Sequence, residues 1–385
     1  MTHRLAIVAT HPIQYYAPWF RFIAERGDFE LKVFYLWKPQ AALDPGFGRV
    51  VEWDVPLLDG YDHAFVANAA GDPGTHHFNG LINPGLSDAL AAWRPDAVLL
   101  MAYNYRSLMP LIMGWRKTPI LFRGDSHRLV SASGPICWLK ELGIAGFFRR
   151  FSACLYVGEA NREYFTRHGV TEDRLFFSPH CVDNARFAAG RGLGREKREE
   201  LGIGPDEAVV LFAGKFQPKK RPDLLLSAFQ RLNTSAHLIL LGNGEMEPML
   251  RERAHGSGRI HFLPFQNQSA MPAWLDACDV LVLPSEGPAE TWGLIINEVQ
   301  NLAKPVIVSD HVGCWKDLVA ARDSEPPGIV FPAGNEAKLA EALQTLLADP
   351  ARRRTMGDAG ARRVARYTMQ AAADGLVEAV RSVTR

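Results

Sequence analysis

The chain has 385 residues, 47% of them hydrophobic and 22% charged, and its formal net charge is +1. This length is sufficient for two domains with full cores, and the balanced charge argues against nucleic acid as a partner. No apolar stretch approaches the roughly 20 residues that a membrane-spanning helix needs, and five scattered cysteines without a C-x-x-C pair indicate reduced thiols in a cytoplasmic protein.

Strand-like and helix-like segments alternate along the N-terminal half. Helices are expected over 16–26 and 86–93, and strands are expected over 5–10, 31–35, 96–101, 119–122, 153–157 and 175–178. This alternation is typical of a parallel sheet with helices on both faces. A segment rich in glycine and charge, 184–206, then interrupts the pattern. We place the domain boundary there, with an N-terminal domain over 1–187 and a C-terminal domain over 188–367.

The alternation restarts beyond the boundary. Strands are expected over 209–213, 237–241, 260–263, 280–283 and 305–308. Helices are expected over 222–232, 246–255, 270–277, about 293–303 and about 335–347, with one or two more in the tail over 352–383. The sequence therefore predicts an α/β fold of two Rossmann-like, doubly wound parallel-sheet domains.

Two glutamates lie in the segment 284–298, between two buried-strand patterns. Glu290 precedes a predicted helix, Gly293 begins it, and Glu298 follows in its second turn. Carboxylate oxygens accept hydrogen bonds from sugar and ribose hydroxyls, and backbone N–H groups at a helix start favour an anion. The alternative is that both glutamates are solvated surface carboxylates. In this context we favour a polar site for a ligand with hydroxyls and phosphate.

A basic loop follows an earlier buried strand. The strand over 209–213 ends in Gly214, and Lys215 and Lys220 come next. Cations at the carboxyl end of a strand suit a diphosphate, although a solvated basic loop is the alternative. A weaker signal is Gly242, where a strand meets a glycine pair, and the typical G-x-G-x-x-G dinucleotide motif is absent.

Residues 178–385 resemble the donor domain of retaining GT-B glycosyltransferases, the large family called glycosyl transferases group 1, whose members carry two glutamates with seven residues between them. The resemblance rests on six segments in matching order and spacing: 178–187, 214–220, 241–244, 284–298, 303–307 and 356–362. It implies two domains facing a cleft, with a C-terminal helix over about 368–385 that crosses back to pack on the first domain.

The resemblance also implies roles for individual residues. Lys215 and Lys220 would hold the donor diphosphate, Glu290 the sugar hydroxyls and Glu298 the ribose. The remaining donor-binding residues would be Gly214, Gly242, Pro264, Phe265, Thr291, Trp292, Gly293 and Leu294. The implied chemistry is transfer of a sugar with retention of configuration, with positive charge beside the departing phosphate. No D-x-D triplet occurs, so we expect no metal and no cofactor, only a UDP- or GDP-linked sugar as co-substrate.

The N-terminal half departs from the family pattern. His11 and Gln14 stand where the family has a glycine-rich loop, and they could supply side-chain hydrogen bonds, although His11 could equally be structural. Arg123 takes the place of a histidine that often faces the reaction centre, with Asp125 and His127 just beyond. We count these three as candidate catalytic residues and expect at least one to touch donor or acceptor. Tyr103 and Asn104 are candidates for the acceptor cleft, with ordinary loop residues as the alternative.

Two further segments have plain alternatives. His76 and His77 lie in a polar loop, where we expect them to be exposed and without metal ligands nearby. The apolar and basic segment 147–151 would suit contact with the inner membrane surface, but we favour a helix packed on the sheet. The oligomeric state is left open.

The sequence thus favours a retaining, metal-independent glycosyltransferase that moves a sugar from a nucleotide-sugar to a hydroxyl of a carbohydrate, lipid-linked or small-molecule acceptor. Two alternatives remain: a GT-B nucleotide-sugar epimerase or hydrolase, and a non-catalytic partner that binds a nucleotide-sugar. Cytoplasmic location with peripheral contact at the inner membrane face is compatible with each.

Overall fold

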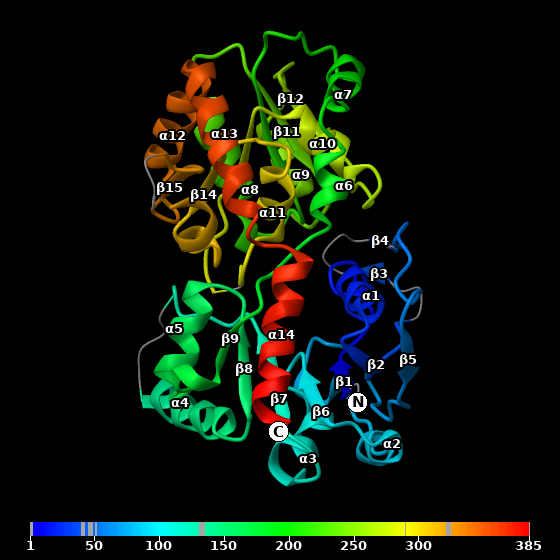
Figure 1. Cartoon of the computed structure of the whole chain (residues 1–385). Coiled ribbons are helices and arrows are strands. Elements are labelled where there is room, and N and C mark those ends of the chain that lie inside the picture. The colour runs from blue at the N-terminus through cyan, green and yellow to red at the C-terminus, as the bar shows by residue number, and fades with distance from the viewer. Residues whose placement is uncertain are drawn as a thin grey trace.

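A computed structural model describes residues 3–39, 43–44, 49–50, 52–130, 135–288, 290–320 and 325–384. Its main elements are two parallel sheets, one of seven strands and one of six, each flanked by helices (Figure 1). We call them the first and the second sheet, in chain order. The predicted α/β fold with two doubly wound sheets is confirmed.

The first sheet has the strand order β5-β2-β1-β6-β7-β8-β9. Its strands are β1 His3–Ala9, β2 Phe29–Tyr35, β5 Asp62–Phe65, β6 Ala97–Leu100, β7 Ile120–Gly124, β8 Ala153–Tyr156 and β9 Leu175–Phe177. The α-helices that connect them are α1 Ala17–Arg26, α2 Leu86–Trp93, α3 Met109–Gly114, α4 Pro135–Phe148 and α5 Glu159–Arg167. Short elements complete this half: β3 Leu43–Asp44, β4 Arg49–Val50, and the 3-10 turns η1 Phe78–Gly80, η2 Arg106–Leu108 and η3 Glu172–Arg174.

The second sheet has the order β12-β11-β10-β13-β14-β15. Its strands are β10 Val209–Ala213, β11 His237–Leu241, β12 Ile260–Leu263, β13 Val280–Leu283, β14 Val306–Ser309 and β15 Gly328–Phe331. The helices that follow the first sheet are α6 Asn184–Ala188, α7 Gly194–Glu200, α8 Pro222–Gln230, α9 Glu247–Arg253, α10 Met271–Ala277, α11 Leu294–Gln300, α12 Glu336–Ala348, α13 Pro350–Val364 and α14 Met369–Val383. A 3-10 turn, η4 Pro218–Lys220, and a π-helical turn, η5 Trp315–Val319, lie among them.

Central strands such as β6, β10 and β13 are apolar and buried along their whole length because helices cover both faces of each sheet. In β1, Leu5 and Ile7 are buried in one cluster while Ala6 and Val8 are buried in another, on the opposite face. Successive side chains of a strand point to opposite faces, so each sheet carries two cores. All four clusters consist of residues that are less than a tenth exposed.

The last helix, α14, returns to the first sheet although α12 and α13 pack with the second (Figure 1). It contacts β8, β9 and α1, and its residues Leu376 and Val380 are buried in a core of the first sheet. The fit is close, since a Cβ at Gly375 would lie 1.8 Å from the carbonyl oxygen of Phe177. The predicted crossing helix is therefore confirmed.

The chain passes to the second sheet through α6, which packs against α10 and α11. Phe187 in α6 is fully buried in a core of the second sheet. The boundary between residues 187 and 188 stays a prediction, and this packing places α6 with the C-terminal part. Within the described residues, no helix is both long enough and apolar enough to cross a membrane.

Candidate active site

A cavity of about 440 Å³ is lined by residues from both halves of the chain. The N-terminal half contributes Ile13, Gln14, Tyr15, Tyr16, Trp53 and Asp125, and the linker contributes His180. The C-terminal half contributes, among others, Gly214, Lys215, Lys220, Gly242, Phe265, Glu290, Thr291, Trp292, Gly293, Leu294 and Glu298. Most of the residues predicted to bind a donor therefore surround one space.

The floor of the cavity is formed where β10 and β11 end side by side. These strands pair in parallel with Ala213 opposite Leu241, so the glycines that follow them are neighbours. A Cβ at Gly242 would lie 1.9 Å from the carbonyl oxygen of Gly214. Gly242 also has a φ of 146°, so no larger residue fits there without a shift of the backbone. Both glycines line the cavity beside Lys215.

Glu290 and Lys220 form an ion pair that lines the cavity. The same carboxylate oxygen of Glu290 accepts a hydrogen bond of 2.8 Å from the hydroxyl of Ser285, which is fully buried at the end of β13. The Glu290 carbonyl oxygen accepts from the backbone N–H of Gly313 at 3.0 Å. Backbone and side chain of Glu290 are thus both held in place.

Glu298 lies in α11 with only 1% of its surface exposed, and it lines the same cavity. Burial raises the pKa of its carboxyl to about 7, against the opposing effects of the Tyr15 hydroxyl and the Arg186 guanidinium. Within the described part of the chain, its Oε1 atom has no hydrogen-bond partner. A buried acceptor left unpaired is costly, so this atom is suited to a donor from a ligand.

Gly293 precedes α11 with a φ of 97°, in the left-handed region that favours glycine. A Cβ there would lie 2.9 Å from a side-chain carbon of Leu283 and 3.0 Å from one of Val312. The glycine therefore allows the chain to turn sharply between Glu290 and Glu298. The helix begins at Leu294 and ends at Gln300, shorter than the predicted 293–303.

Asp125 reaches across from the end of β7 to the loop that carries Glu290. Its carboxylate accepts a hydrogen bond of 2.7 Å from the hydroxyl of Thr291 and lies 3.3 Å from Nε2 of His180. Burial would raise the pKa of Asp125, but the hydrogen bonds of His180 and Thr291 outweigh it and lower the pKa to about 2. The group is therefore an anion at neutral pH and connects both halves at the cavity wall.

Two of the candidate residues near β7 lie outside the cavity lining. Arg123 is 2% exposed, and its guanidinium donates to the carbonyl oxygens of Ser178 and Pro179 at 2.9 to 3.3 Å. It also packs over the ring of Trp19, so burial and these carbonyls hold it away from the cavity. His127 pairs with the carbonyl oxygen of Glu290 through Nε2, at 3.2 Å, and so supports the loop from behind.

Four further predicted residues also lie outside the cavity lining. His11 contacts the hydroxyl of Thr10 at 3.0 Å, and burial lowers its pKa to about 4, so it is neutral and structural. Tyr103 packs among the aromatic rings of the core behind β7, and Asn104 is exposed. The carbonyl oxygen of Pro264 accepts from the side-chain amide of Gln266. Pro264 does not line the cavity, whereas Phe265 and Gln266 do.

Several lining residues were absent from the predicted set, among them His180, Tyr15 and Trp53. His180 lies in the linker segment that carried the family resemblance, and Tyr15 directly follows the predicted Gln14. Trp53 comes from a loop of the N-terminal half, and its ring meets the edge of Phe265 at 5.9 Å. For His180 and Tyr15, the neighbouring motif residues could have indicated the position, but nothing in the sequence indicated Trp53.

Residues 194–363 match the family described as glycosyl transferases group 1. This match covers 170 of the 385 residues, less than half of the chain, and lies in its C-terminal half. The match begins at the start of α7 and ends within α13, so it contains the second sheet and the glycine, lysine and glutamate positions described above. The group 1 assignment thus agrees with the site that the cavity defines.

Two curated relatives share one name, D-inositol 3-phosphate glycosyltransferase. The chain is 33% identical over 260 residues to a D-inositol 3-phosphate glycosyltransferase of Streptomyces bingchenggensis. This match covers 59% of the chain and 53% of the relative. The chain is 30% identical over 239 residues to the protein of that name from Kineococcus radiotolerans, with 57% and 54% covered. The chain therefore matches about half the length of these relatives.

Solved structures share the whole fold at low identity. A sucrose-phosphate synthase from Thermosynechococcus elongatus superimposes with a TM-score of 0.73 and 19% identity, covering 98% of each chain. The Anabaena protein HepE, in complex with UDP and glucose, gives a TM-score of 0.71 at 16% identity, with 99% and 100% covered. At this identity the likeness establishes the GT-B fold alone.

Proposed function

We propose that this protein is a retaining glycosyltransferase that transfers a sugar from a UDP- or GDP-linked donor to an acceptor hydroxyl. One observation carries the proposal: Lys215, Lys220, Glu290 and Glu298 line a single cavity between the two halves. Positive charge, hydroxyl-binding carboxylates and exposed strand-end backbone are the groups that a nucleotide-sugar requires.

The donor would extend from the strand ends toward Trp53. Its diphosphate would lie near Gly214 and Lys215, where backbone and ammonium groups meet. The ribose hydroxyls would donate to the unpaired oxygen of Glu298, and the base would lie against Phe265 and Trp53. The UDP and glucose bound to the structurally similar HepE support this class of ligand.

In the reaction, the bond between the anomeric carbon and the phosphate oxygen breaks, a bond to the acceptor oxygen forms, and the proton of the acceptor hydroxyl passes to the departing phosphate. Negative charge develops on the leaving diphosphate, and the lysines stabilise it without a metal ion or another cofactor. Glu290, now paired with Lys220, would accept hydroxyls of the sugar once the diphosphate shares that ammonium group. Retention follows from the family resemblance and is part of the proposal.

The acceptor would enter from the N-terminal side, where Gln14 and Asp125 line the cavity. The relatives' name points to a phosphorylated cyclitol as one acceptor class. The chain spans about half the length of those relatives, so their name does not fix the acceptor. The proposal therefore also includes carbohydrate and lipid-linked acceptors, as in polysaccharide synthesis. The segment 147–151 gives no specific support to membrane contact, since Phe148 and Phe151 are buried in the core.

The test begins with a thermal-shift screen of UDP, GDP, ADP and TDP and their sugars, since a ligand that binds the folded state raises its apparent stability. Transfer from the selected donor is then measured for Glu290→Gln and for the matched control Glu286→Gln, whose carboxylate pairs with Arg221 outside the cavity. We expect the first variant to lose nearly all transfer and the second to keep it. Equal turnover in both would contradict the proposal.

The same donor and assays distinguish the proposed transferase from two alternatives. A nucleotide-sugar epimerase or hydrolase would turn over the donor without an acceptor, which is followed by release of nucleotide or by a new sugar signal in proton NMR. A non-catalytic partner would bind the donor with no turnover across a broad acceptor panel. The anomeric coupling constant of the product reports whether configuration is retained.

A further inference from the structure

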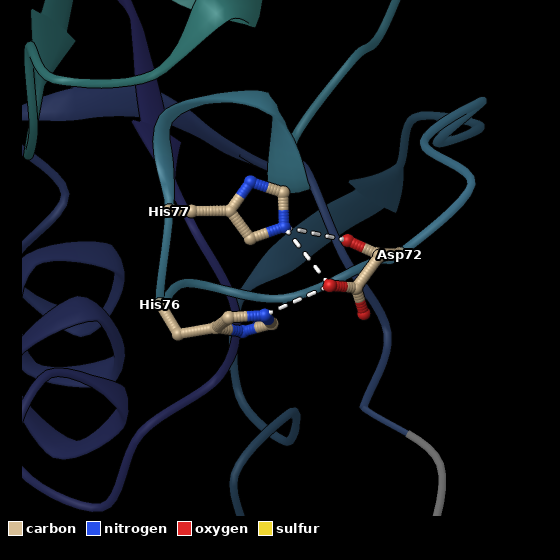
Figure 2. Close-up of side chains that lie close together, drawn as sticks. All are labelled: Asp72, His76 and His77. Atoms are coloured by element: carbon tan, nitrogen blue, oxygen red, sulfur yellow. Dashed lines mark hydrogen bonds and ion pairs between the residues drawn. The ribbon is translucent and has the colours of Figure 1, made fainter.

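Three potential metal ligands meet in the loop between β5 and η1. The Nε2 atom of His76 lies 3.1 Å from Oδ2 of Asp72, and Nε2 of His77 lies 3.2 Å from the same oxygen. Both rings point toward the carboxylate from the opposite limb of the loop (Figure 2). The expectation that these histidines have no ligand nearby is wrong, because the loop folds Asp72 back onto them.

The backbone of this loop is held by its own hydrogen bonds. The N–H of Gly74 donates to the carbonyl oxygen of Gly80 at 3.1 Å, and the N–H of Gly80 donates to that of His77 at 3.1 Å. The hydroxyl of Tyr105 donates to the carbonyl oxygen of Thr75 at 3.0 Å. The backbone that carries the three side chains is therefore closed into a loop, which lowers the entropic cost of gathering ligands.

Gly74 makes room for one of the rings. A Cβ at this position would lie 2.6 Å from Nδ1 of His76. The glycine thus lets the imidazole lie against the backbone with its Nε2 atom turned toward Asp72. Any larger residue at 74 would move that ring.

The spacing of the ligand atoms fits a small transition-metal ion. In a tetrahedral site with ligand distances of about 2.0 to 2.1 Å, neighbouring ligand atoms lie about 3.3 Å apart. The two nitrogen-to-oxygen distances here are 3.1 and 3.2 Å, and all three ligand atoms lie within 4.8 Å of one another. The two nitrogen-to-oxygen distances are therefore close to those of such a site.

The chemistry of the ligands selects the class of cation. Imidazole nitrogen suits Zn²⁺, Cu²⁺, Ni²⁺ and Fe²⁺, whereas Mg²⁺ and Ca²⁺ prefer oxygen ligands alone. Two histidines and one carboxylate supply three ligands, which leaves the fourth position of a tetrahedral ion for water or another group. The partial exposure of all three residues leaves that side open to solvent.

We propose that Asp72, His76 and His77 form a binding site for a Zn²⁺-class divalent cation, separate from the cavity of the proposed transferase. None of these residues lines that cavity. The ion would replace the two hydrogen bonds to Asp72, with each histidine supplying its neutral Nε2, and would join the two limbs of the loop. The proposal is independent of which reaction the cavity performs.

The test is isothermal titration of the full chain with ZnCl₂, in a buffer that binds no metal and with a reductant that is not a thiol. We expect one strong equivalent for the wild type and no comparable binding of Mg²⁺ or Ca²⁺. His76→Ala, His77→Ala and Asp72→Asn should each weaken zinc binding at least about tenfold. The control His255→Ala removes an exposed histidine from another loop and should leave binding unchanged.

A second measurement distinguishes a loss of zinc binding from a loss of folding. Circular dichroism of each variant should match the wild type because all four positions are on the surface. With Co²⁺ in place of Zn²⁺, the wild type should show a visible d–d absorption band that the His77→Ala variant lacks. Equal zinc stoichiometry and affinity in wild type and in the His76→Ala/His77→Ala double variant would overturn the proposal.

Discussion

The two halves of the cavity are built in different ways. On the C-terminal side, Gly214, Lys215, Gly242 and Glu290 follow the ends of β10, β11 and β13. Parallel strands bring their carboxyl ends to one edge, so short local motifs arrive together. On the N-terminal side, Asp125 is placed by contacts with residues 55 and 166 positions away. The C-terminal side of the cavity therefore follows from local sequence, whereas the N-terminal side depends on how the whole chain folds.

The largest expected effect would break the C-terminal half. Lys215→Ala removes an ammonium group beside the proposed diphosphate, and we expect kcat to fall by about 10² to 10³, as when one stabilising donor is lost. Lys219→Ala is the control, because this exposed lysine lies in the same loop and outside the cavity lining. Steady-state transfer of the two variants, with folding checked by circular dichroism, decides the point. Similar losses in both would assign the effect to the loop and not to Lys215.

A second change would break the contact between the halves. Asp125→Asn replaces a charged acceptor of Thr291 and His180, and Thr291→Val removes the hydroxyl while keeping its shape. Each should lower kcat by about tenfold, the equivalent of one charge-assisted hydrogen bond. Because both act on the same bond, the double variant should lose little more than either alone. Additive losses would show that the two residues act separately.

A third change would sharpen the comparison through pH. Glu298 has a pKa raised to about 7, so the folded protein binds a proton more tightly than the unfolded chain does. Its contribution to the free energy of unfolding is complete below the unfolded pKa near 4.5 and is lost as the pH rises to about 7, by up to about 3 kcal/mol. Glu298→Gln, always neutral, should therefore have a higher Tm than the wild type at pH 8 and a similar Tm at pH 5.

The same variant should bind nucleotide less well, with an expected loss of about tenfold in affinity, because the amide offers one acceptor oxygen and no charge. Thermal unfolding of the ligand-free protein across pH 5 to 8 and titration with nucleotide measure the two effects separately. A Tm difference that does not change with pH would place the pKa of Glu298 near its ordinary value.

The smallest expected effect on turnover belongs to Arg123. Its guanidinium holds the carbonyl oxygens of Ser178 and Pro179 and does not line the cavity. Arg123→Met should lower the free energy of unfolding by about 2 to 4 kcal/mol, since buried carbonyls lose a charged donor. The kcat of the folded protein, measured well below its Tm, should change less than about threefold. A loss comparable to that of Lys215→Ala would return Arg123 to the reaction centre.

The sequence predicted most of the second sheet and many of the residues on its side of the cavity. Long apolar strands and glycine-terminated loops are signals within a few residues, and Lys215, Lys220, Glu290 and Glu298 were all found this way. Elements with weak signals were missed, such as β15, the strand at one edge of the second sheet, and α5, a helix whose sequence is mostly polar.

The sequence by itself determined the α/β architecture, the parallel order of elements and the glycine, lysine and glutamate positions, because periodicity and strand-end motifs are local. Only the tertiary structure decided that Asp125 faces Thr291, that Arg123 turns into the core, and that Asp72 returns to His76 and His77. The reason is physical: a side chain's direction and partners depend on which distant surfaces pack against it. Those surfaces exist only once the sheets, helices and loops have assembled.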